Sequence, residues 1–331
     1  MKLIDKYNRV HDYLRISLTD KCNYNCIYCN PTNNLNNLNN SDLLSFEEIL
    51  RLIEFFASKF EFKKFRFTGG EPLVRKDIFE FLAEVGKLKT RYGFTTGITT
   101  NGSLLEGKSG LLKKVGIDNL NISLDSISKS GFNDITKNDH LSKILGVINE
   151  SLDAGYSPLK INTVVIKEIN DYEVIDFVDY FRDKDVNLRF IEFMPFGNNS
   201  WEKEGFVSYK EIKNIIDCKY SLQSLPNKSN SVSKDFQLEK FKAKISFITS
   251  VSDHFCGNCN RIRISSKGNF RVCLFEEGNH NINFKTLLKS NCTDDELVSL
   301  ISSAIKTKWE KHVDPEELAL LSQNNMMTIG G

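Results

Sequence analysis

Strand-like and helix-like segments alternate along the first two-thirds of the chain, and this alternation constrains the fold more than any other feature. Short apolar segments rich in β-branched residues predict strands, and segments with apolar residues at helical spacing lie between them. The six expected strands are residues 13–19, 64–70, 97–102, 119–125, 160–166 and 187–195. The clearest helical patterns are residues 45–60, 77–93, 141–155 and 171–184. A strand followed by a helix, repeated about six times, predicts parallel strands joined by right-handed crossovers.

Six strand–helix units predict an α/β fold, a TIM-like barrel with too few strands to close. A complete (β/α)8 barrel has eight strands, so a (β/α)6 barrel leaves one side open. Polar signatures follow the expected strands: a loop with three cysteines after the first, and then "TGGEP", "TTNG", "SLDS" and "MPFG". Ligands of parallel α/β sheets sit at the carboxyl ends of the strands. We therefore expect one active face, built from at least five strand ends.

The strand–helix rhythm breaks down after about residue 198. Residues 221–235 predict a loop or hairpin connection, residues 243–250 a strand, and residues 294–312 a helix. We therefore expect a partial barrel over residues 1–199 and a smaller C-terminal region over residues 200–331.

Charge and hydropathy exclude some classes of partner. The 44 Lys and Arg against 43 Asp and Glu leave a net charge of +1, whereas a nucleic-acid-binding surface is normally strongly basic. No stretch approaches the roughly 20 apolar residues of a membrane span, and the N-terminus lacks the apolar core of a signal peptide. We expect a cytoplasmic protein that binds neither nucleic acid nor membranes.

Six of the eight cysteines form two triads. The first triad is Cys22, Cys26 and Cys29, and the second triad is Cys256, Cys259 and Cys273. In a long chain without a secretion signal such groups favour metal or redox chemistry over disulfides. Structural zinc takes four ligands, whereas an iron–sulfur cluster held by three cysteines leaves one iron open to a small chelating ligand. The spacing alone leaves both possible, with His254 as a fourth zinc ligand at the second triad.

Several cations occupy positions on expected strands, where a charge is costly unless it faces a polar cavity. The alternative is an ion pair inside the barrel with Glu71, Asp125 or Glu192. Arg261 and Arg263 are two residues apart on an extended segment, so both point to the same face, beside Cys259. The cations on the expected barrel strands are Arg15, Lys64, Arg66 and Lys160.

The first triad, with Tyr28 inside it and "GGEP" after it, resembles the radical S-adenosylmethionine (SAM) superfamily. There, three cysteines hold a 4Fe–4S cluster whose fourth iron is chelated by SAM. The second triad, with "CNRIRIS" inside it and "IGG" at the C-terminus, narrows the resemblance to the GTP 3′,8-cyclase family of molybdenum cofactor biosynthesis. The likeness extends from Leu14 to Gly331.

This resemblance implies a lyase with two 4Fe–4S clusters and SAM. It implies that a 5′-deoxyadenosyl radical removes hydrogen from C3′ of GTP and that the carbon radical attacks C8, giving 3′,8-cyclo-7,8-dihydro-GTP. The six triad cysteines would be the metal ligands, and the residues implied to contact SAM are Tyr28, Gly70, Glu71, Ser123 and Met194. The residues implied to contact GTP are Arg15, Lys64, Arg66, Thr99, Lys160, Arg261 and Arg263. Arg261, Arg263 and the terminal Gly330 and Gly331 are implied to assist catalysis.

The resemblance also implies partners: an electron donor such as flavodoxin or ferredoxin, the downstream cyclic pyranopterin monophosphate synthase, and a second copy in a homodimer. Two other functions fit parts of the pattern. One is a peptide-modifying radical SAM enzyme, although those usually carry more C-terminal cysteines. The other is a non-enzymatic protein with two zinc sites, although such sites are normally closed and four-coordinate. The arginine pair and the Gly-Gly tail favour the cyclase.

Overall fold

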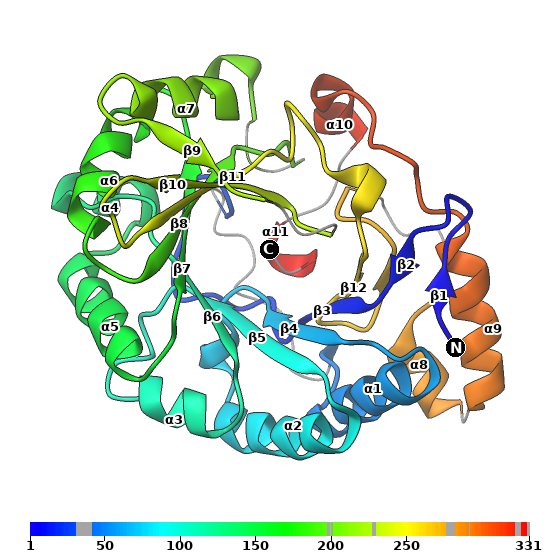
Figure 1. Cartoon of the computed structure of the whole chain (residues 1–331). Helices are drawn as coiled ribbons and strands as arrows, with labels where there is room; N and C mark the ends of the chain where they lie inside the picture. Colours follow the sequence, from blue (N-terminus) through cyan, green and yellow to red (C-terminus); the bar gives the residue numbers. More distant parts are fainter. Residues whose placement is uncertain are drawn as a thin grey trace.

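The computed structural model describes residues 1–30, 42–196, 199, 201–226, 230–275, 282–290, 292–321 and 326–329. Within this part of the chain, six parallel strands follow one another around a partial barrel, each paired with the next (Figure 1). They confirm the six expected strand–helix units and the predicted α/β class. The strands are β3 (Tyr13–Ser17), β4 (Lys64–Thr68), β5 (Thr95–Thr100), β6 (Asn119–Ser123), β7 (Leu159–Val165) and β8 (Val186–Glu192).

Helices cover the outside of this barrel (Figure 1). The first begins at a capping box, in which Ser45 Oγ accepts from Glu48 N while the Glu48 side chain accepts from Ser45 N. The sequence did not single out α3 and α4, which are 6 and 8 residues long and too short for a clear helical period. The outer helices are α1 (Phe46–Lys59), α2 (Ile78–Tyr92), α3 (Ser109–Lys114), α4 (Lys129–Thr136), α5 (Leu141–Asp153) and α6 (Val174–Phe181).

C-terminal strands extend the barrel sheet at both edges, giving, in the described part of the chain, 11 strands in the order β13-β12-β3-β4-β5-β6-β7-β8-β11-β10-β9. β12 pairs parallel to β3, and β11 pairs parallel to β8, whereas the outermost strands are antiparallel. Strands from both sides of the expected boundary at residues 199/200 therefore belong to one continuous sheet. The division into two regions remains a prediction from the sequence. The added strands are β9 (Leu222–Ser224), β10 (Ser233–Leu238), β11 (Lys244–Ile248), β12 (Arg261–Ile264) and β13 (Phe270–Arg271).

The remaining elements are the helix that follows β8, segments that flank the barrel and a short helix inside it. The expected helix over residues 294–312 ends early, at Ile305, and the chain beyond it turns inward so that Lys308 and His312 become buried. The short helix α11 lies at the centre of the ring of strands (Figure 1). These elements are β1 (Leu3–Ile4), β2 (Val10–His11), α7 (Tyr209–Asp217), α8 (Phe284–Lys289), α9 (Asp294–Ile305), α10 (Pro315–Leu321) and α11 (Met326–Ile329). Short 3-10 helices span Pro72–Val74, Asp171–Glu173, Lys203–Gly205 and Cys256–Asn258.

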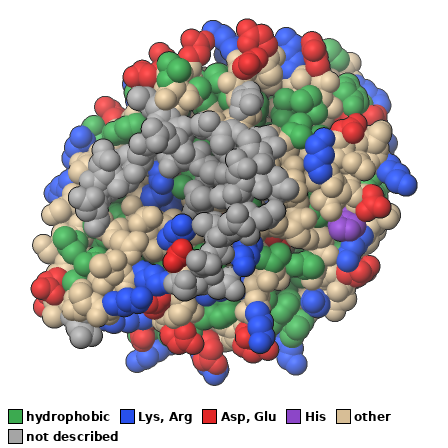
Figure 2. All heavy atoms as spheres, turned by 180° about the vertical axis from the view of Figure 1, so that it is seen from behind, with side chains coloured by type: hydrophobic (Ala, Val, Ile, Leu, Met, Phe, Trp, Pro, Cys, Tyr) green, Lys and Arg blue, Asp and Glu red, His purple; other side chains and the backbone are tan. Residues whose placement is uncertain are grey.

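Side chains of the barrel strands alternate between an apolar outer layer and a polar interior. In β7, Leu159, Ile161 and Val165 are buried beneath the helices, whereas Lys160 and Asn162 face inward and keep some exposure. Seen from the side opposite to Figure 1, Lys and Arg are interspersed with Asp and Glu around the rim (Figure 2). Among the described helices, none has the length and apolar character needed to cross a bilayer.

Candidate active site

A cavity of about 630 Å³ occupies the interior of the barrel, within the roughly 300–1,000 Å³ typical of small-molecule sites. It reaches from Met194, just beyond β8, to Arg261 at the start of β12. Every residue implied to contact GTP lines it, because each stands at an inward-facing position of its strand. These residues are Arg15, Lys64, Arg66, Thr99, Lys160, Arg261 and Arg263.

The cavity is strongly cationic. Arg189 adds a seventh Lys or Arg to the six above, and the described lining contains one carboxylate, that of Asp235. Such convergence of like charge is costly unless an anion neutralises it. On the barrel strands β3 to β8, the polar lining residues that the sequence analysis missed are Tyr13, Asn119, Asn121, Asn162, Asn187 and Arg189.

Arg66 shows how the backbone supports this charge. Its Nε donates to the Tyr13 hydroxyl at 2.8 Å, and its Nη1 donates to Ile98 O at 3.0 Å. Gly97 leaves room for it, because a Cβ at that position would lie 2.7 Å from Arg66 Nη2. Among the described residues it forms no ion pair with Glu71, Asp125 or Glu192, so the expected alternative of an internal ion pair is wrong for Arg66.

The pKa values of the cavity groups reflect this mutual repulsion. Burial, together with the charges of Arg66 and Arg189, lowers the pKa of Lys160 to about 7. Burial opposes ionisation of the Tyr13 phenol, but the neighbouring arginines Arg66 and Arg15 outweigh it and lower its pKa to about 6. Both shifts indicate a site at which negative charge is stabilised.

The second triad forms part of the cavity wall. Cys256 and Cys259 lie on a 3-10 turn just before β12, with Cys259 N donating to Cys256 O at 3.1 Å, and Cys273 follows β13. Because β12 is parallel to β3, this triad lies at the end of the barrel where β3 begins. Burial raises the pKa of the Cys259 thiol, but the positive charges of Lys308 and Arg261 outweigh it and lower that pKa to about 6.

The first triad lies beyond the opposite end of β3, on the loop that follows Ser17. Cys29 N and Asn30 N donate to Cys26 O at 3.0 and 2.9 Å, which closes a tight turn around the triad. The expected single active face thus accounts for the first triad only. The second triad lies at the opposite end of the barrel, and the cations lie on the strands themselves, deeper in the barrel than the first triad.

The "TGGEP" glycines hold the first-triad loop close to the barrel. A Cβ at Gly70 would lie 2.4 Å from Lys21 O, and Gly70 N donates to Thr19 O at 2.8 Å. The glycines are therefore required for backbone packing against the cysteine loop, whatever they contact in a ligand.

Replacing Gly70 with alanine is expected to lower the free energy of unfolding by about 1–3 kcal/mol, because the new Cβ overlaps the Lys21 carbonyl. Urea unfolding of the metal-free protein measures this. Gly146→Ala is the control: its Cβ meets no atom within 4 Å, inside α5, and it is expected to stabilise the protein by about 0.5–1 kcal/mol. Equal effects of the two changes would contradict the close-packing argument.

Two buried carboxylates organise the strand ends around the first triad. Glu71 accepts from Thr100 Oγ1 at 2.8 Å and Asn101 N at 2.7 Å, and burial raises its pKa to about 7 despite these bonds. Asp125 accepts from the Tyr28 hydroxyl at 2.7 Å and Val164 N at 2.8 Å, and burial raises its pKa to about 6. Of the residues implied to contact SAM, Tyr28, Gly70, Glu71 and Ser123 lie at this end, and Met194 lines the cavity.

The donor set of the first triad fits an iron–sulfur cluster. All three thiols are free of disulfides. Burial and then neighbouring negative groups raise the pKa of Cys22 to about 11 and of Cys29 to about 12, so thiolates here need a cationic centre beside them. Among the described residues no three His, Cys, Asp or Glu side chains converge on one metal ion. A four-iron cluster instead binds each cysteine through a separate iron.

The comparisons with known proteins agree with this geometry. Residues 16–181 match the model of the radical SAM superfamily, and residues 186–314 match that of Molybdenum Cofactor Synthesis C. The GTP 3′,8-cyclase of Syntrophomonas wolfei is 38% identical over 331 residues, covering 99% of this chain and 100% of the relative. The mitochondrial GTP 3′,8-cyclase of Arabidopsis thaliana is 39% identical over 330 residues, covering 99% and 83%.

Other relatives are longer. Molybdenum cofactor biosynthesis protein 1 of Dictyostelium discoideum is 41% identical over 332 residues, covering 99% of this chain and 52% of the relative. The chain thus spans about half the length of several of the curated relatives that it matches. A crystal structure of Streptococcus suis SuiB bound to S-adenosylmethionine shares the fold, with a TM-score of 0.63 at 15% identity over 90% of this chain and 69% of that one. The chain belongs to the radical SAM superfamily and, within it, to the GTP 3′,8-cyclase family.

Proposed function

We propose that this chain is a GTP 3′,8-cyclase, which converts GTP into 3′,8-cyclo-7,8-dihydro-GTP in the first step of molybdenum cofactor biosynthesis. The observation that carries the proposal is the barrel cavity, where seven Lys and Arg of the described residues converge beside a free cysteine triad. A nucleoside triphosphate supplies the several negative charges that such a cavity needs. Arginine forks bind phosphate oxygens in pairs, which fixes the nucleotide in one orientation.

The first triad would hold a 4Fe–4S cluster, with SAM bound beside it at the strand ends. When bound, these groups supply a 5′-deoxyadenosyl radical. Cys22, Cys26 and Cys29 provide the thiolates, and Glu71 and Asp125 fix the surrounding backbone through their buried hydrogen bonds. The barrel wall positions the ribose and keeps water from the reacting atoms.

The second triad would hold a second 4Fe–4S cluster that takes the guanine base as its remaining ligand. Cys256, Cys259 and Cys273 line the same cavity as the cations, so one nucleotide can reach both. Arg261 and Arg263 both line the cavity beside this triad and are proposed to contact GTP and assist catalysis.

The C-terminal segment supports a role for the Gly-Gly tail. Met326 of α11 lines the cavity, and Ile329 is buried with Phe196, Phe275 and Leu318. Gly330 and Gly331 lie outside the described residues. We propose that they assist the reaction, because the helix before them is already seated at the centre of the barrel (Figure 1).

The proposal includes partners that chemistry requires. The cluster needs a one-electron donor such as flavodoxin or ferredoxin, and the product needs the cyclic pyranopterin monophosphate synthase. We also propose that two copies of this chain form a homodimer and that the protein is located in the cytoplasm. The mixed charge of the face in Figure 2 supports the expectation that nucleic acid is not a partner.

GTP binding is expected to weaken as the pH rises above 7. In the empty cavity the pKa of Lys160 is about 7, and a bound triphosphate raises it, so binding takes up a proton. Affinity is therefore full below pH 7 and is lost as the pH rises toward the raised pKa, by about tenfold or more at pH 8.5. Titration calorimetry in buffers of different ionisation enthalpy measures the proton uptake. Lys160→Arg keeps its charge, and its pH dependence should be flatter; an unchanged profile would contradict the role of Lys160.

The reaction itself is tested anaerobically. The protein is reconstituted with iron and sulfide, given SAM, GTP and dithionite, and its products are identified by mass spectrometry. We expect 5′-deoxyadenosine, at a level that GTP increases, together with a 3′,8-cyclised nucleotide. If 5′-deoxyadenosine forms while GTP stays intact, the substrate is another molecule, as for a peptide-modifying enzyme. Bound zinc without SAM cleavage would favour the structural-zinc alternative.

A further inference from the structure

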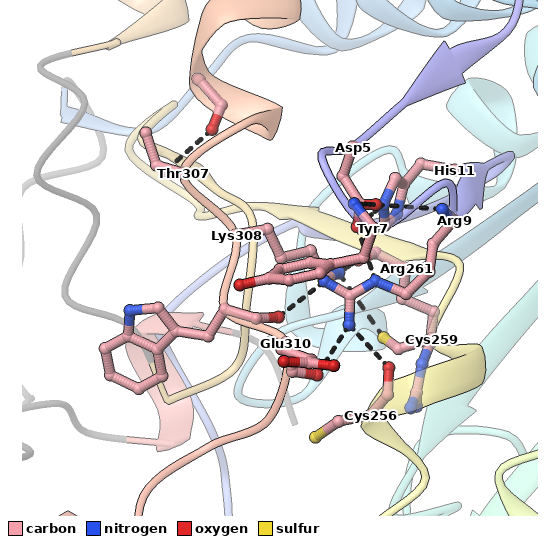
Figure 3. Close-up of polar contacts among 12 residues, drawn as sticks. Asp5, Tyr7, Arg9, His11, Cys256, Cys259, Arg261, Thr307, Lys308 and Glu310 are labelled. Atoms are coloured by element: carbon pink, nitrogen blue, oxygen red, sulfur yellow. Dashed lines mark hydrogen bonds and ion pairs between the residues drawn. The ribbon is translucent and has the colours of Figure 1, made fainter.

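Residues 308–312, which we call the strap, leave the end of α9 and pass beside the second triad (Figure 3). Lys308 is 2% exposed, and its Nζ donates to Arg261 O at 2.6 Å and to Cys259 Sγ at 3.5 Å. His312, at the other end of the strap, is buried as well, and one of its ring nitrogens lies 3.0 Å from Ser250 O. The strap therefore supplies a hydrogen bond to one thiol of the triad, that of Cys259.

Arg9, in the N-terminal hairpin, fastens this strap. Its Nη2 donates to Trp309 O at 2.6 Å, and its Nη1 donates both to Glu310 O at 3.0 Å and to Cys256 O at 2.7 Å (Figure 3). One guanidinium thus joins the strap to the turn that carries Cys256. Arg9 is itself held by Asp5, whose Oδ2 accepts from Arg9 Nε at 2.6 Å.

The charge of Lys308 needs a partner. A buried ammonium is costly unless a negative group lies beside it. The contacts described for Lys308 are to a carbonyl and to the Cys259 thiol, and neither is a carboxylate. A metal-bound thiolate at Cys259 would supply the missing negative charge, so the lysine and the metal centre would stabilise each other.

We propose that Arg9 and Lys308 are positioning residues of the second triad, which set how firmly it holds its metal centre. Arg9 fastens the strap to the turn of Cys256, and Lys308 donates to Cys259. Outer partners of metal ligands typically change metal affinity about 10- to 100-fold when removed. This inference rests on the second cluster of the proposed function.

The test uses the full chain, reconstituted anaerobically, and does not depend on GTP turnover. It measures the rate at which a chelator removes iron from the second centre and the reduction potential of that centre by electron paramagnetic resonance. The Cys273→Ala protein defines the signal of the first centre. Lys308→Met and Arg9→Gln are expected to lose second-centre iron about 10- to 100-fold faster. Lys308→Met should also lower the potential, because a positive charge favours the reduced cluster, and Lys308→Arg should restore it.

Matched exposed residues provide the controls. Lys87→Met and Arg91→Gln remove cations whose side chains are 73% and 69% exposed, and they should behave as the unchanged protein. Arg9→Lys keeps the charge but loses the planar guanidinium, so this variant should still release iron quickly. It replaces Arg9→Gln in the test if Arg9→Gln does not fold. Unchanged release rates and potential, with a normal second centre, would overturn this inference alone. Equal iron in the unchanged and Cys273→Ala proteins would overturn it together with the second cluster.

Discussion

Cys273→Ala is expected to halve the iron content and to abolish GTP cyclisation while SAM cleavage continues slowly. The variant removes one ligand of the second triad, so iron should fall from about eight atoms per chain to about four. The first triad lies at the opposite end of β3 and keeps its three thiols. Without its anchor the nucleotide is no longer held against the radical, and a misplacement of about 1 Å can cost about 100-fold in rate.

Iron analysis, 5′-deoxyadenosine yield and cyclised-nucleotide yield measure this together. Cys218→Ala is the matched control, because Cys218 is a lone, exposed cysteine at the end of α7. It should retain full iron and full activity. Cyclised GTP at the normal rate from Cys273→Ala would refute the anchoring role of the second triad.

Arg66→Met is expected to weaken GTP binding by about 2 kcal/mol or more, which is roughly 30-fold in Kd. Arg66 is buried, and its Nη1 reaches the Thr99 hydroxyl at 3.2 Å on the cavity wall. Removing it takes one charged donor away from the bound phosphate oxygens. Affinity for guanosine, which carries no phosphate, should change little.

Equilibrium binding of GTP and guanosine to the reconstituted protein provides the measurement. Arg91→Met is the control, since the exposed Arg91 pairs with Glu54 and neither residue lines the cavity. SAM cleavage without GTP should be the same in both variants. If Arg66→Met binds GTP as tightly as the unchanged protein, the triphosphate does not occupy this cavity.

Much of the barrel could be predicted from the sequence because its signals are local. Period-two apolar segments gave the six parallel strands, and cations within such segments, Arg15 and Arg66 among them, indicated a polar interior that the structure confirms. The same rule would have found Arg189, which lies between Leu188 and Phe190 in β8. Asparagines at alternate strand positions, such as Asn119 and Asn121, also indicated a polar barrel interior.

Other features depend on pairing between distant parts of the chain. β12 adds to the edge at β3, across nearly the whole sequence, and only that register places the second triad at the opposite end from the first. Arg9 donates to the backbone carbonyl groups of Cys256, Trp309 and Glu310. Because every residue has such a carbonyl group, the sequence cannot show which ones Arg9 binds. The sequence could not show that α9 ends before the strap, because the strap is buried by contacts with distant parts of the chain.

The most direct test of the proposed reaction follows one hydrogen atom. GTP carrying deuterium at C3′ is turned over anaerobically with SAM and dithionite, and the mass of the 5′-deoxyadenosine is measured. The account predicts that the deuterium appears in 5′-deoxyadenosine and is missing from the cyclised nucleotide. If 5′-deoxyadenosine forms without deuterium while GTP is consumed, hydrogen is taken from another position, and the assignment as a 3′,8-cyclase is wrong.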